Sequence, residues 1–133
     1  FDLVQFWNLE TRELVKAFRG AAARISPDGS TLAFYHEQKL RLLDLKTMKQ
    51  TGAIASPRLN RLVWSPDGKH IAGKGYDKAI HWIDVTTGTR ISQATGHGKY
   101  IYCIVFSPDG KWLATGSGDG SVKLWAVQRM DGE

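Results

Sequence analysis

The sequence contains a single cysteine, Cys103, so no disulfide bond can form within the chain, and disulfide-stabilised small domains are excluded. It lacks any apolar run approaching the roughly 18 residues that a membrane-spanning helix needs. The N-terminus shows no basic stretch followed by an apolar core, so no secretory signal is visible. Because Cys103 lies in an apolar segment, we expect it to be a packed core residue rather than a nucleophile.

The chain begins with Phe1 instead of Met, which suggests a trimmed, processed or partial sequence. The missing signal therefore leaves the compartment unknown. The single cysteine, expected to be reduced, together with that missing signal favours the cytoplasm.

Runs of basic residues are also missing. The chain carries 18 lysines and arginines and a net charge of +5, but no two of these basic residues are adjacent. A nucleic-acid interface normally gathers its basic residues into a patch or stripe. We therefore predict a mildly basic solvated surface, with neither nucleic acid nor a membrane as the partner.

The sequence does contain an internal repeat. The tetrapeptide Ser-Pro-Asp-Gly occurs three times, each time after an apolar or aromatic residue and before a short apolar run. The copies are Ser26, Pro27, Asp28 and Gly29; Ser65, Pro66, Asp67 and Gly68; and Ser107, Pro108, Asp109 and Gly110. Proline presets φ, aspartate accepts hydrogen bonds from nearby backbone amides, and glycine tolerates positive φ, so each copy predicts a turn between two strands.

The segments between these turns are short, alternating and rich in β-branched or aromatic residues, which is typical of β-strands. Two further turn signals per unit give four strands in about 40 residues, the content of one propeller blade. We predict an all-β, partial β-propeller of about three four-stranded antiparallel blades with thirteen strands. The units are residues 1–20 (the last two strands of a preceding blade), 21–56, 57–96, and 97–133 (a blade without its fourth strand).

The third unit resembles a WD repeat nearly end to end, from Gly96-His97 through the Ser-Pro-Asp-Gly turn to Trp125, while the first two units are degenerate. The resemblance implies a blade pinned by a hydrogen-bonded set of histidine, serine or threonine, aspartate and tryptophan. In this chain that set is His97, Thr115 or Ser117, Asp119 and Trp125. The residue after the tryptophan, usually aspartate in the family, is Ala126.

The repeat positions also account for most residues that would otherwise suggest catalysis. Seven carboxylates fall at signature positions, and the other histidines, His36, His70 and His81, fall at different blade positions without metal-ligand spacing. We therefore expect no catalytic residues, no metal and no cofactor.

The resemblance implies that proteins or peptides dock on the loops that precede the first strand and that join the second strand to the third. Transferred to this chain, it nominates a candidate face of eight residues: His36, Glu37, Arg58, Asn60, Arg61, Tyr76, Tyr100 and Tyr102. Tyrosine and arginine suit such an interface because they combine large contact area with hydrogen-bonding tips. A charge on a first strand, as at Arg61, should face the central channel or a partner's acid.

Two functions remain open at this point. The chain is either a non-catalytic scaffold module that assembles protein complexes, or a regulatory or substrate-docking propeller segment of a larger multidomain enzyme. Three blades are too few for a ring, so we expect a fragment of a longer propeller or copies that self-associate to complete one. In the second case, Glu13 to Arg19 would supply the missing strand of the last blade.

Overall fold

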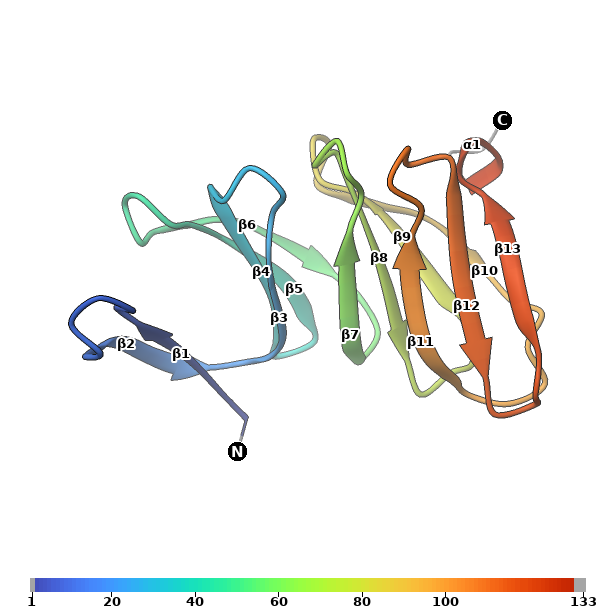
Figure 1. Ribbon diagram of the computed structural model, residues 1–133, viewed down its shortest axis with the longest axis horizontal. Helices are drawn as coiled ribbons and strands as arrows, with labels where there is room; N and C mark the ends of the chain where they lie inside the picture. The colour runs from blue at the N-terminus through green and yellow to red at the C-terminus, as the bar shows by residue number, and fades with distance from the viewer. Residues whose placement is uncertain (1, 131–133) are drawn as a thin grey trace.

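Thirteen strands in the described residues form four antiparallel sheets that follow one another in an arc (Figure 1). The structure is a computed structural model that describes residues 2–130; the outermost positions of the first and last predicted units, 1 and 131–133, lie outside the described residues. The two termini lie at opposite ends of the arc. The predicted all-β, partial-propeller fold and the strand grouping of two, four, four and three are confirmed for this part of the chain.

Each sheet is contiguous in sequence. The N-terminal pair consists of β1 (Leu3–Trp7) and β2 (Leu14–Arg19). The first blade consists of β3 (Ala21–Ile25), β4 (Thr31–His36), β5 (Lys39–Asp44) and β6 (Gln50–Ala55). The second blade consists of β7 (Leu59–Trp64), β8 (His70–Gly75), β9 (Ile80–Asp84) and β10 (Thr89–Ala94). The third blade consists of β11 (Ile101–Phe106), β12 (Trp112–Ser117) and β13 (Val122–Ala126), followed by α1 (Val127–Met130).

The three Ser-Pro-Asp-Gly turns join the first and second strands of the blades, and they share one hydrogen-bond pattern. In each, the serine hydroxyl donates to the aspartate Oδ1 at 2.6 Å. The glycine then adopts a φ between 72° and 76°, a region that glycine enters without steric cost. Hydrogen bonds from Ser26 and Ser30 lower the pKa of Asp28 to about 2, so this carboxylate stays ionised in the folded chain.

The turns between third and fourth strands use a different acceptor. Asn8, Asp44 and Asp84 each accept two backbone N–H groups through a side-chain oxygen. The matching position at the end of β13 is Ala126, whose side chain has no hydrogen-bond acceptor. There the chain enters α1 instead of a turn, an element that the repeat pattern did not predict.

Apolar side chains fill the space between neighbouring sheets. Leu40, Leu62 and Ile83 belong to the cluster between the first and second blades. Trp82 and Ile104 belong to the cluster between the second and third. At about 25 cal/mol per Å² of buried apolar area, these clusters are the main stabilising term.

One polar contact also joins the first two blades. The indole Nε1–H of Trp64 donates to the Arg24 carbonyl oxygen at 3.0 Å. Since Arg24 lies on β3 and Trp64 on β7, the bond links the first strands of neighbouring blades.

The outward faces at the two ends of the arc retain exposed apolar side chains. Leu3 and Trp7 are exposed in the N-terminal pair, and Val122 and Leu124 are exposed on β13. The idea that the strand from Glu13 completes the third blade of the same chain is wrong here, because β2 pairs with β1 at the other end of the arc.

Cys103 was expected in the core, and that expectation is wrong: the residue is exposed. Ile101 and Ile104 are the buried residues of β11, because a register shift between Ile101 and Cys103 interrupts the alternation of faces. Cys103 pairs in register with Gly116, and Gly116 with the exposed Val122. The thiol therefore belongs to the open face of the third blade.

Candidate interaction face

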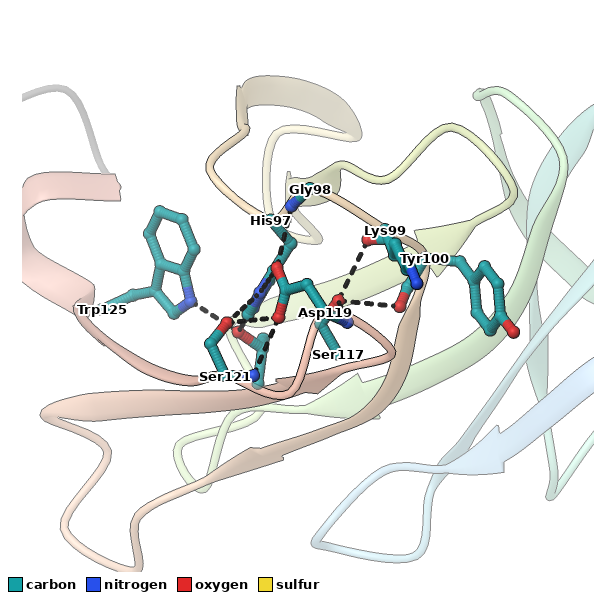
Figure 2. A network of polar contacts seen from close by, with 9 residues as sticks. His97, Gly98, Lys99, Tyr100, Ser117, Asp119, Ser121 and Trp125 are labelled. Atoms are coloured by element: carbon teal, nitrogen blue, oxygen red, sulfur yellow. Dashed lines mark hydrogen bonds and ion pairs between the residues drawn. The ribbon is translucent and has the colours of Figure 1, made fainter.

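A partly buried hydrogen-bonded network ties the third blade together (Figure 2). The indole of Trp125 donates to the Thr115 hydroxyl oxygen at 2.8 Å. The imidazole Nε2 of His97 lies 2.7 Å from that oxygen, and its Nδ1 lies 3.3 Å from the Asp119 carboxylate. A carboxylate only accepts, so Nδ1 carries the proton and Nε2 accepts from the Thr115 hydroxyl. Every member is thereby satisfied.

Asp119 is the anionic end of this network. Its carboxylate accepts hydrogen bonds from the Gly98 amide at 2.8 Å, from the Ser121 amide at 2.8 Å and from the Ser121 hydroxyl. These bonds, led by the Ser121 hydroxyl, hold the pKa of Asp119 well below its ordinary value of 3.8.

The structure distinguishes Thr115 from Ser117, which the sequence left as alternatives. Thr115 is 1% exposed and lies between His97 and Trp125. Ser117 instead donates to the carbonyl oxygens of Lys99 and Tyr100, at 3.1 and 3.0 Å. It therefore fixes the loop that precedes β11, as Figure 2 shows.

The second blade has a different polar pair that sequence reasoning missed. His81, on β9, is buried, and its Nε2 lies 2.6 Å from the Asp77 carboxylate in the turn between β8 and β9. Arg90 Nη1 lies 3.3 Å from the His81 Nδ1. The pair was missed because the histidine comes from the third strand and not from the loop that precedes the first.

Each blade has a register shift near the start of its first strand. In β7 the strand pairing skips Asn60, which lies between the paired residues Leu59 and Arg61. In β11 it skips Tyr102, between Ile101 and Cys103. A bulge turns the extra residue away from the alternating pattern. Asn60 and Tyr102 are thereby presented at the same edge of the blades.

A wide crevice of about 810 Å³ opens at this edge, between the N-terminal pair and the first two blades. Arg58, Asn60 and Tyr76 line it from the second blade, and His36 and Glu37 line it from the first. The edge is opposite to the Ser-Pro-Asp-Gly turns, because those turns lie at the other end of β4, β8 and β12.

A narrower crevice of about 340 Å³ lies beside it, between the second and third blades. Its lining includes Asn60 and Tyr76 again, with Lys74, Tyr100 and Tyr102. The two crevices thus share Asn60 and Tyr76. Of the eight residues nominated from the sequence, only Arg61 lines neither; it is exposed on β7, in register with Lys74.

Several contacts hold the side chains of this edge in place. The guanidinium of Arg58 lies 5.6 Å from the centroid of the Tyr76 ring, within cation–π range. The Tyr102 hydroxyl donates to that of Tyr100 at 2.8 Å, and the two rings meet edge to face. Gly75 is required beside Arg58, since a Cβ there would meet the Arg58 carbonyl oxygen at 2.1 Å.

Comparison with known proteins supports the repeat pattern seen in the sequence and the fold. The family model "WD domain, G-beta repeat" matches residues 88–126, which run from the residue before β10 to the end of β13. A protein named serine-threonine kinase receptor-associated protein, from Gallus gallus, is 29% identical over 127 residues. COMPASS component SWD3 from Saccharomyces cerevisiae is 32% identical over 110 residues, and target of rapamycin complex subunit wat1 from Schizosaccharomyces pombe is 41% identical over 76.

The predicted resemblance to the WD-repeat family is confirmed. The matches cover 92%, 80% and 56% of this chain but 36%, 35% and 24% of the three relatives. The chain thus spans about a third or less of the length of the relatives it matches.

No group of three or more histidine, cysteine, aspartate or glutamate residues in positions 2–130 could hold a metal ion. The described part of the chain also has no helix long and apolar enough to cross a membrane.

The WD-repeat pattern did not single out Lys74, although this residue lines the narrow crevice. Lys74 lies on β8, at the position that Gly116 occupies on β12. Its burial depends on the neighbouring third blade, so no local sequence signal marks it.

Proposed function

We propose that this chain is a non-catalytic scaffold segment that binds a protein or peptide at the edge formed by the eight residues of the candidate face. One observation carries the proposal: two adjacent crevices open at this edge and share Asn60 and Tyr76. An extended peptide can therefore contact both without leaving the surface. Aromatic rings and an arginine, the residue types that dominate binding hot spots, are gathered there.

The names of the relatives support a role in assembling complexes. One is named as a complex subunit, one as a complex component and one as a receptor-associated protein. We propose the same class of role here, with protein as the partner and no enzymatic activity. The histidines and carboxylates of the second and third blades support this, since they are engaged in pinning strands and turns.

We also propose blade boundaries at 20/21, 56/57 and 96/97, and a structural role for His97, Thr115, Asp119 and Trp125. The last boundary is supported by the hydrogen bonds of His97 to Thr115 on β12 and to Asp119 in the turn that follows, because they attach His97 to the third blade.

We propose that the exposed apolar ends of the arc associate with further propeller blades, including those of other copies of this chain. Exposed Trp7 and Leu124 support this, because apolar end faces gain free energy when covered. Light scattering coupled to size exclusion tests self-association: masses that rise with concentration are expected, and a folded monomer at all concentrations contradicts it.

Affinity capture with two variants tests the binding face. We expect Arg61→Glu and Tyr102→Ala to weaken capture of the same partners while leaving the melting temperature nearly unchanged, because both side chains are exposed. Lys111→Glu is the matched control, at the opposite end of the third blade. If the partners captured are the same in amount and kind for all variants, the proposed face is wrong.

A further inference from the structure

Lys74 is a buried cation at the contact between the second and third blades. It is 8% exposed, and no other lysine, arginine, aspartate or glutamate in residues 2–130 is buried. On the same face of β8, Ala72 packs into the apolar cluster that also contains Ile101 and Ile104. Burial lowers the pKa of the Lys74 ammonium, and the neighbouring Arg61 lowers it further.

The Lys74 ammonium has no anionic partner in the described residues. Its one hydrogen bond there runs to the amide oxygen of Asn60, at 3.0 Å. None of the ion pairs in residues 2–130 includes Lys74. An ammonium has three protons to donate, so two remain for an acceptor from outside these residues. Burying a charge without a counter-charge costs free energy, and Arg61 in register beside it adds repulsion.

The crevice around Lys74 is shaped for a side chain. Tyr76, Tyr100 and Tyr102 wall the narrow crevice, which has a volume of about 340 Å³. Because Tyr102 donates to the Tyr100 hydroxyl, the proton of Tyr100 remains available as a second donor. Ring faces suit the methylene groups of an entering side chain, while the ammonium and the hydroxyl suit its oxygen atoms.

We propose that the narrow crevice between the second and third blades takes the carboxylate side chain of an acidic peptide, with Lys74 as its counter-charge and Asn60 orienting the ammonium. This inference rests on the proposed function, and it specifies the chemistry of the partner. Glutamate or aspartate is favoured because the site offers one buried ammonium and a hydroxyl, a set matched to a singly charged oxyanion.

A peptide-display selection identifies the preference directly from random sequences. The full chain is presented with a library of random peptides, and the bound peptides are sequenced. We expect an acidic residue to be enriched at one fixed position. Selection on Lys74→Met should lose this enrichment, and selection on the control Lys111→Met should retain it.

Synthetic peptides then measure the interaction. The selected peptide is compared with versions carrying glutamine or phosphoserine at the acidic position, using calorimetry. We expect the change to glutamine to weaken binding at least about tenfold on the natural chain and hardly at all on Lys74→Met. Lys74→Met should fold, since an apolar residue of similar volume removes an unpaired buried charge. Arg61→Gln, at an exposed position, provides a second test. The selected peptide should bind this variant more weakly, and its affinity should depend less on the salt concentration.

The outcomes separate the two claims. If no peptide is enriched on the natural chain, the proposed function fails and this inference fails with it. If peptides bind without an acidic preference, or if the loss with glutamine is unchanged in Lys74→Met, this inference alone is overturned. Tighter Lys74-dependent binding of phosphoserine overturns the assignment of a carboxylate.

Discussion

The His81 imidazole Nε2 lies 2.6 Å from the Asp77 carboxylate, so the second blade contains a histidine–aspartate pair of its own. Arg90 faces the other ring nitrogen at 3.3 Å and can only donate, which leaves Nδ1 as an acceptor and puts the proton on Nε2. In the third blade the histidine comes from the loop before the first strand. Here it comes from β9, so the same two residue types pin the blade from a different position.

We expect Asp77→Ala to lower the free energy of unfolding by about 1–3 kcal/mol, because the buried N–H of His81 loses its acceptor. Urea unfolding followed by tryptophan fluorescence measures this change. Glu10→Ala, in an exposed turn of the N-terminal pair, is the control and should change stability by less than about 0.5 kcal/mol. Equal effects for the two variants would show that the pair contributes nothing beyond an ordinary surface residue.

The third-blade network predicts a difference between two neighbouring hydroxyl residues. Thr115→Val keeps the shape of the side chain but leaves the Trp125 N–H without its acceptor and His97 without its donor. We expect a loss of about 1–3 kcal/mol from Thr115→Val. Ser117→Ala removes exposed bonds that water replaces, and about 1 kcal/mol or less should be lost. Thermal unfolding compares the two variants, and the reverse order would contradict the network.

Acid should destabilise the chain through its turn aspartates. Hydrogen bonds lower the pKa of Asp119 below 3.8 and that of Asp28 to about 2. The unfolded chain binds these protons at higher pH than the folded chain does, so the stabilisation is complete above about pH 5 and is lost as the pH falls toward 2.

Urea unfolding midpoints measured between pH 5 and pH 2 test this dependence. They should fall throughout the range, and the fall should be shallower in Asp119→Asn, which no longer titrates at that position. A midpoint that stays constant to pH 2 would contradict the assigned shifts.

The strand pattern could be predicted from the sequence because turn chemistry is local. Ser107, Asp109 and Gly110 form the same turn wherever their neighbours lie, and the apolar runs between turns then determine the strands. The third-blade network followed from the family resemblance, although the choice between Thr115 and Ser117 required the register of β12.

Features that depend on register or on a neighbouring blade could not be predicted. Cys103 is exposed because a bulge shifts β11 and no sheet covers that face in the described residues. The burial of Lys74 depends on the third blade, which closes over β8. The residues next to Cys103 in the sequence do not indicate the bulge, and those next to Lys74 do not indicate that the third blade covers it.

The central claim is that the edge carrying Asn60, Tyr76 and Tyr102 is the binding face. Backbone amide chemical shifts, recorded by NMR with and without a peptide selected on the full chain, test it most directly. We predict that the largest shifts fall on Asn60, Tyr76 and Tyr102, while the amides of Gly29, Gly68 and Gly110 at the opposite edge are unchanged. Shifts concentrated at those glycine turns, with none around Asn60, would contradict the account.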